Sequence, residues 1–244
     1  MAPLHADWPA PDWVRAFTTT RAGGVSSGPW ATFNLGERCG DDPRAVAHNR
    51  ALFRAALPSE PGWLRQVHGA RVLRREDLGA EAVEADAVWS ATPRLACTVL
   101  TADCLPVLFC DPEGRRVAAA HAGWRGLAAG VLQATVQAMG AEPGRLLAWL
   151  GPGISQAAYT VGEEFRNAFL ALDPGQELGL AQAFVHNDGA WRADLYAIAR
   201  GLLAGCGLHQ VFGGEYCTYT DAARFFSYRR DGNCGRMATT IWMG

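Results

Sequence analysis

Three residues with metal-ligand chemistry stand where short apolar runs end near the middle of the sequence. They are His68, Cys104 and His121. If those runs are strands, their ends can converge at one edge of a sheet. Two imidazoles and one thiolate suit Zn²⁺, and three protein ligands leave the open coordination position of a catalytic zinc site. A metal ion held in this way polarises a bound oxygen or deprotonates water.

The residue types alone leave other interpretations open. A histidine at a strand end is commonly a hydrogen-bonded structural residue, and a cysteine after apolar residues is commonly a small buried hydrophobe. The sequence contains neither a Cys-x-x-Cys pair nor a His-Glu-x-x-His motif, so the spacing does not select a metal site. Cys104 could instead be a nucleophile with His68 or His121 as its base.

A helix is predicted from about Arg125 to Met139, with Gly140 as its stop. Its start would place free backbone N–H groups and the Arg125 guanidinium beside His121, which favours an anion such as phosphate. An ordinary helix start with a surface arginine is the alternative. Asp103, next to Cys104, is a candidate for orienting a histidine or moving a proton, although it could equally cap a turn.

Other polar residues are candidates for contacts to substrate or phosphate. Arg50 is predicted to help Arg125 hold phosphate, with a solvated helix residue as the alternative. Arg229 and Arg230 follow four aromatic or hydroxyl-bearing residues in the segment 225–232, a composition that a substrate pocket could have. A buried strand that runs into a solvated turn, with a surface arginine pair, is equally compatible with this segment.

The elements that must position these residues are read from apolar periodicity and turn residues. A strand is predicted at Trp13 to Thr19, and Asp42 with Pro43 predicts the cap and first position of a helix. Short apolar runs bounded by turn residues then predict strands at 63–67, 85–89, 96–101, 106–110 and 116–120. Helix and strand segments alternate after them, so the fold class is mixed α/β.

Length and composition bound the class of protein. The chain has 244 residues, 49% of them hydrophobic and 19% charged, which predicts one globular domain spanning 1–244. A net charge of −2 without clustered Lys and Arg argues against nucleic acid and anionic membranes as partners. No apolar stretch is long enough to span a membrane, and the N-terminus lacks the pattern of a secretory signal. Seven scattered cysteines predict reduced thiols and a cytoplasmic location.

Several strings of the sequence together resemble the YfiH-like laccase-domain family, once described as polyphenol oxidases and now as purine nucleoside phosphorylases. The resemblance extends over almost the whole chain, and its most specific strings contain the three ligand-type residues. These strings are Asn34-Leu35-Gly36, His48-Asn49-Arg50, Gln66-Val67-His68-Gly69, Thr101-Ala102-Asp103-Cys104, Ala119-Ala120-His121-Ala122-Gly123-Trp124-Arg125-Gly126 and Phe225-Phe226-Ser227-Tyr228-Arg229-Arg230.

The resemblance implies a fold, a cofactor and an activity. The fold would be a layered α/β sandwich with a mixed β-sheet core, and one zinc ion per chain would be held by His68, Cys104 and His121. The implied reaction is phosphorolysis of adenosine, inosine or guanosine to the free base and ribose 1-phosphate. Separately, we expect the protein to be a monomer. We add Asn34 to the residues expected to bind substrate or phosphate. Methylthioadenosine phosphorolysis and adenosine deamination are also attributed to the family.

Three rival functions remain at this point. Some bacterial members of the family are described as cytoplasmic editing amidases that remove a wrongly added serine from a peptidoglycan precursor. Multicopper oxidation of phenols is disfavoured because the chain has only six histidines and no His-x-His pair. A non-catalytic protein with a structural metal is the third rival, but closed structural sites usually have four ligands and only three are evident.

Overall fold

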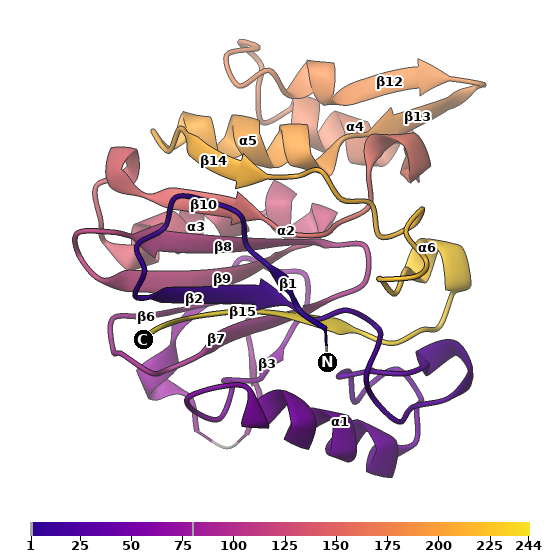
Figure 1. Ribbon diagram of the computed structural model, residues 1–244. Helices are drawn as coiled ribbons and strands as arrows, with labels where there is room; N and C mark the ends of the chain where they lie inside the picture. The colour runs from indigo at the N-terminus through magenta and orange to yellow at the C-terminus, as the bar shows by residue number, and fades with distance from the viewer. Residues whose placement is uncertain (1, 80) are drawn as a thin grey trace.

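The computed structural model describes residues 2–79 and 81–244 (Figure 1). The helices of this part of the chain are α1 (Pro43–Ala55), α2 (Trp124–Ala128), α3 (Val131–Met139), α4 (Glu163–Leu170), α5 (Leu195–Gly205) and α6 (Tyr228–Asp231). None of them is long and apolar enough to cross a membrane.

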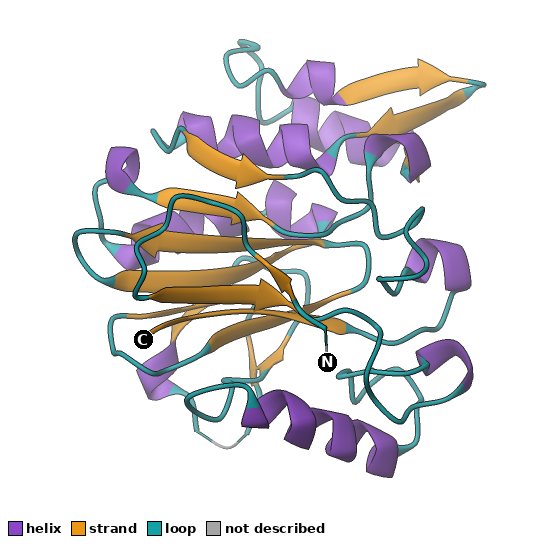
Figure 2. Cartoon of the chain, in the orientation of Figure 1, coloured by secondary structure: helices purple, strands orange, loops and turns teal. Residues whose placement is uncertain are grey.

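Two larger sheets form the centre of the molecule, and Figure 2 shows their strands running through its middle with helices outside. The six-stranded sheet has the order β14 (Gln210–Gly213), β10 (Leu147–Leu150), β8 (Leu105–Asp111), β9 (Arg116–Ala122), β6 (Ala87–Ser90) and β4 (Val72–Arg74). The four-stranded sheet has the order β1 (Leu4–His5), β2 (Val14–Thr18), β15 (Met237–Met243) and β7 (Cys97–Thr101). Two smaller sheets join β11 (Thr160–Val161), β13 (Ala190–Ala193) and β12 (Phe184–Asn187), and β3 (Leu64–Arg65) with β5 (Val83–Glu84).

The two larger sheets pack face to face, and helices cover their outer faces. Side chains of both sheets, among them Val99, Leu108 and Ile241, share one buried apolar cluster. A second cluster lies between the six-stranded sheet and helices α3, α4 and α5, and a third joins α1 to β2 and β15. The six-stranded sheet is mixed, because β10–β14 and β4–β6 pair in parallel and its other pairs are antiparallel. The predicted layered α/β fold is confirmed.

Strands β8 and β9 are buried on both faces. Along β9, Val117 and Ala119 point into the core between the sheets, whereas Ala118 and Ala120 point towards the helices. A strand that faces a core on each side reads as a continuous apolar run, which is why the sequence predicts it so directly. Polar side chains of these strands are consequently confined to the strand ends.

The sequence predicts most elements with small shifts at their ends. Strand β2 lies inside the predicted 13–19, and α1 begins at Pro43 with the Asp42 side chain accepting from the Arg44 N–H at 2.9 Å. Of the apolar residues expected on the packed face of this helix, Val46 and Phe53 are buried, whereas Leu52 is exposed. The sequence therefore encodes this helix locally, through its cap and its apolar face.

Two expectations need correction. The single helix predicted for 125–139 is two helices, α2 and α3, because Gly130 adopts a left-handed φ of 89° between them. Gly140 does end α3, as predicted, with φ 59°. Residues 225–227 form no strand: Phe225 and Phe226 are buried in a loop, and Ser227 caps the short helix α6 by accepting from the Arg230 N–H.

Candidate metal centre

The three ligand-type residues meet at one end of the sandwich. His121 lies on β9, opposite Pro106 of β8 in the antiparallel ladder, and Cys104 immediately precedes β8. His68 comes from the loop after β3. One potential ligand atom from each residue lies within 4.8 Å of the other two, so the three side chains could hold a metal ion. The structure thus brings together residues that are up to 53 positions apart, from His68 to His121.

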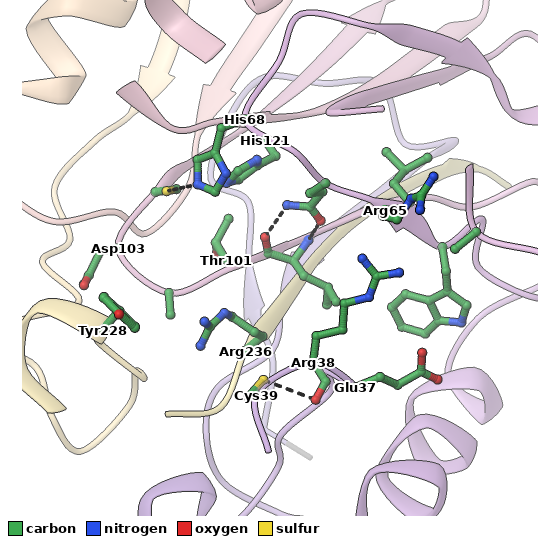
Figure 3. A pocket seen from close by; sticks show the side chains of 18 of the residues that line it. Glu37, Arg38, Cys39, Arg65, His68, Thr101, Asp103, His121, Tyr228 and Arg236 are labelled. Atoms are coloured by element: carbon green, nitrogen blue, oxygen red, sulfur yellow. Dashed lines mark hydrogen bonds between the residues drawn. The ribbon is translucent and has the colours of Figure 1, made fainter. Parts of the chain in front are cut away.

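The side chains of the cluster face one another. Cys104 Sγ lies 3.7 Å from His68 Nε2, and the two imidazole rings are 4.7 Å apart at an interplanar angle of 80°. Figure 3 shows both rings at one end of the cavity. His121 is buried, Cys104 is half-buried and His68 is exposed, so one side of the cluster is open to an incoming molecule.

Asp86 contacts two of the three residues. Its Oδ1 lies 2.8 Å from His121 Nδ1, and its two carboxylate oxygens accept backbone N–H groups from Val67, His68 and Gly69 at 2.7 to 3.2 Å. Burial raises the pKa of Asp86, but the hydrogen bonds from His121 and from the backbone outweigh burial and lower it. Asp86 is therefore an ionised, acceptor-only group at neutral pH.

Cys104 and His121 influence one another electrostatically. Burial raises the pKa of the Cys104 thiol, but the His121 and His68 imidazoles outweigh it and lower that pKa. Burial lowers the pKa of His121, but the Cys104 thiolate and Asp86 outweigh it and raise that pKa. The lowered pKa favours the thiolate form of Cys104, and the thiolate is the form of cysteine that acts both as metal ligand and as nucleophile.

Gly123 leaves space for the cluster. A Cβ atom at this position would lie 2.6 Å from His68 Cδ2 and 3.1 Å from Cys104 Sγ. The backbone φ of −68° is accessible to any residue, so space rather than conformation requires glycine here. The backbone after β9 can therefore lie this close to His68 and Cys104 only because Gly123 has no side chain.

A cavity of about 460 Å³ opens beside the cluster and is within the size range of small-molecule sites. Its wall contains His68, Cys104 and His121 together with aromatic and positively charged side chains. Figure 3 shows Arg38, Arg65 and Arg236 on the side of the cavity away from the imidazoles. The remaining basic residues and the aromatic residues of the wall are Arg50, Arg229, Trp63, Tyr159 and Tyr228.

Three of these guanidinium groups have no carboxylate within ion-pair distance among the described residues, although Arg229 and Arg236 donate to backbone carbonyls. Arg50 pairs with Glu37, and Arg65 pairs with Glu84 at 3.1 Å. Within residues 2–79 and 81–244, Arg38, Arg229 and Arg236 form no ion pair with a carboxylate. The cavity is thus suited to an anion.

The polar residues predicted from sequence divide into two groups. Arg50, Asp103 and Arg229 line the cavity, whereas Asn34, Arg125 and Arg230 are absent from the wall that the described residues form. Arg125 lies over the Trp124 ring, 4.5 Å from its centroid. Asn34 is buried and hydrogen-bonded to Asp41 and to the Gly36 backbone.

Two predicted residues have structural partners. Arg230 donates to the backbone carbonyls of Thr218, Tyr219 and Phe225. Asp103 accepts from the Thr218 hydroxyl and from the Arg229 N–H, each at 2.6 Å. These contacts tie the loop that carries Cys104 to the start of α6.

Three residues of the site were not predicted from the sequence: Asp86, Arg38 and Arg236. Asp86 lies in the predicted strand 85–89, but its contact with His121 depends on the pairing of β6 with β9, which the sequence does not show. Arg38 and Arg236 lie 198 positions apart in the sequence, and no local pattern marks them. Only the assembled cavity brings them together.

The fold and the cluster define a layered α/β protein whose His-Cys-His group could hold a metal ion beside a cavity of ligand size. Residues 15–244 match the sequence profile of the family described as multi-copper polyphenol oxidoreductase laccase. The chain belongs to this family.

Relatives of known name resemble the chain over nearly its full length. A purine nucleoside phosphorylase of Pseudomonas aeruginosa is 51% identical over 242 residues, which is 98% of either chain. Purine nucleoside phosphorylase YfiH of Escherichia coli is 50% identical over 97% of this chain and 96% of its own. A solved Neisseria meningitidis protein superimposes with a TM-score of 0.94 at 47% identity, covering 100% of this chain and 99% of its own.

Replacing Gly123 by Ala tests the spatial requirement of the cluster. The added methyl group would displace the His68 ring or the Cys104 sulfur, so we expect metal binding to weaken while folding is retained. Zinc content by elemental analysis and thermal unfolding of the metal-free protein are the measurements. Gly162→Ala is a matched control, because a Cβ there meets nothing within 4 Å. Normal zinc content in Gly123→Ala would contradict the described packing.

The thiolate character of Cys104 predicts selective alkylation. In metal-free protein at pH 7 we expect Cys104 to react with iodoacetamide faster than Cys97 and Cys110, whose pKa values burial raises. Because the pKa of Cys104 is lowered, its reaction should slow only when the pH falls below that lowered value. Peptide mass spectrometry measures each site separately.

Cys217 provides the internal control for this experiment. Hydrogen bonds from Ser155 and Thr220 lower its pKa against the opposing effect of burial, so it should also react. Added zinc should protect Cys104 and leave Cys217 reactive. Equal protection of both cysteines would mean that zinc acts by a general effect and not at the cluster.

Proposed function

We propose that the protein is a zinc-dependent purine nucleoside phosphorylase, and that zinc is held by His68, Cys104 and His121. The observation that carries the proposal is the cavity in which these residues share a wall with unpaired guanidinium groups. Phosphorolysis needs both a polarising centre and a site for phosphate. The names of the relatives at 50 and 51% identity support the same activity.

Zinc fits the donor set better than a group of copper ions does. Two imidazoles and a thiolate with an open side match catalytic zinc. Oxidation by several coppers requires further histidine clusters, and within the described residues only this group of three qualifies as a metal site. A single blue-copper centre shares the His-Cys-His donors but usually adds a long axial methionine. No methionine is present in the described wall of this cavity.

The reaction exchanges one bond at the sugar carbon for another. The N-glycosidic bond breaks, a phosphate oxygen bonds to C1′, and the departing base takes up a proton. When bound, zinc would act as a Lewis acid that polarises an oxygen of the reacting groups. Arg229 and the other unpaired arginines would hold phosphate through charge-assisted hydrogen bonds.

Tyr159 is suited to donate a hydrogen bond in the cavity. Burial and the neighbouring Cys104 raise the pKa of its phenol to about 12, so the hydroxyl stays protonated at neutral pH. Its ring also lies under Arg229, whose guanidinium carbon is 4.9 Å from the ring centroid. We propose that Tyr159 and Arg229 contact substrate together. The protein is further proposed to work in a reducing cytoplasm, which agrees with seven free cysteines.

Phosphate dependence is the direct test of this function. We expect release of free base from inosine or adenosine to require phosphate and to yield ribose 1-phosphate in equal amount. The measurement is initial rate by chromatography, with phosphate varied and zinc supplied. Base release that ignores phosphate would replace the proposal with a nucleoside hydrolase. Release of serine from the aminoacylated peptidoglycan precursor, without action on nucleosides, would replace it with an amidase.

A pair of arginine variants tests where phosphate binds. Arg229→Met should raise the KM for phosphate about tenfold or more, because a charge-assisted hydrogen bond contributes about 1.5 to 3 kcal/mol. Arg125→Met is the comparison, since Arg125 is exposed and lies outside the described wall of the cavity. Zinc content should be unchanged in both variants. The opposite ranking of the two KM values would place phosphate at the start of α2, as the sequence alone suggests.

A further inference from the structure

We propose that Asp86 is a positioning residue that presets the metal centre by fixing the loop of His68 and the ring of His121 with one carboxylate. The inference rests on the proposed binding of zinc by the cluster. Asp86 is completely buried and immediately precedes β6, beside the end of β9. It is the link between two ligand-bearing segments that are distant in the sequence.

The contact to His121 determines which ring nitrogen is free. The ladder pairs Ala87 with Ala120, so Asp86 and His121 are cross-strand neighbours at its end. His121 donates its backbone N–H to the Asp86 carbonyl at 2.7 Å, and its Nδ1 lies 2.8 Å from Asp86 Oδ1. Because a carboxylate only accepts, Nδ1 carries a proton, and Nε2 is the ring nitrogen left for the metal.

The contact to the His68 loop fixes a backbone conformation. His68 has a left-handed φ of 61°, a backbone conformation that is strained for residues other than glycine. Val67, His68 and Gly69 donate their consecutive N–H groups to the Asp86 carboxylate. Such a concave run of N–H groups is an anion-binding nest, and here a side chain of the same chain occupies it. The carboxylate thereby stabilises the turn that aims the His68 ring.

Both carboxylate oxygens are used twice. Oδ1 accepts from the His68 N–H at 2.9 Å and from His121 Nδ1, and Oδ2 accepts from Gly69 at 2.7 Å and Val67 at 3.2 Å. Because its oxygens already accept four hydrogen bonds, Asp86 orients the proposed zinc ligands His68 and His121 and does not itself bind the metal. In Asp86→Asn, the amide NH₂ would replace one of the two oxygens. Its hydrogens would then face one of the two pairs of N–H donors, and this contact is repulsive. Asp86→Asn must therefore disturb the His121 ring or the His68 turn.

The experiment measures zinc affinity by competition with a chelator, using zinc alone as the probe. We expect Asp86→Asn to bind zinc about 10- to 100-fold more weakly than the wild type, the range typical of residues that orient metal ligands. The matched control is Asp111→Asn. Asp111 is equally buried and accepts the N–H groups of Glu113 and Gly114, in the turn between β8 and β9. This control should lose stability without losing zinc affinity.

A second measurement keeps the inference testable if Asp86→Asn does not fold. Nitrogen-15 NMR of the wild-type imidazoles should show His121 with a proton on Nδ1 in the metal-free protein and zinc on Nε2 in the loaded protein. Coordination through Nδ1, or equal zinc affinity of Asp86→Asn and wild type, would overturn the role of Asp86. Wild type that binds no zinc would overturn both this role and the metal in the proposed function.

The outcomes for Asp86 and for the proposed function are separable. Wild type that binds zinc but releases no base with phosphate would refute the phosphorylase function. The affinity comparison and the NMR assignment would still decide the role of Asp86, since neither uses nucleoside turnover.

Discussion

The burial of one carboxylate between a sheet end and a loop is the constraint on which the centre depends. An isolated charge in an apolar interior is strongly destabilised, and it persists only when hydrogen bonds replace its water. The Asp86 carboxylate receives four such bonds, from a ring nitrogen and three backbone N–H groups. The same bonds that make the burial tolerable hold β9 and the His68 loop together, so stability and site geometry are coupled through one residue.

The layered core explains why the site lies where it does. Strands β8 and β9 are apolar along both faces because sheets or helices cover each side. Polar groups are consequently excluded from the middle of these strands and gather where the strands end. Cys104 and His121 stand at adjacent ends of β8 and β9, whereas the arginines of the wall come from other segments, such as the chain before α1 for Arg38 and helix α6 for Arg229. The sandwich therefore fixes two of the three ligand-type residues, whereas His68 and the arginines come from segments outside its two larger sheets.

How much the sequence predicts depends on whether a feature is local. The α1 cap and the doubly buried strands are encoded by neighbouring residues. The ligand triad was selected by the family resemblance, because the residue types at strand ends left other interpretations open. The break at Gly130 was missed because periodicity continues across it, while φ at that glycine does not follow from periodicity. Asp86 was missed because its function depends on the pairing of β6 with β9. That register becomes visible only in three dimensions.

The arginines beside the His-Cys-His group distinguish phosphorolysis from phenol oxidation better than the donor atoms of that group do. Two imidazoles and a thiolate could bind copper or zinc, so the donor set alone does not distinguish oxidation from group transfer. An electron-transfer centre has no need for unpaired guanidinium groups in the wall of a wide cavity. An anionic co-substrate does need them, because desolvated phosphate must recover charge-assisted hydrogen bonds. Arg38, Arg229 and Arg236 meet this requirement, and they favour transfer to phosphate over oxidation of phenols.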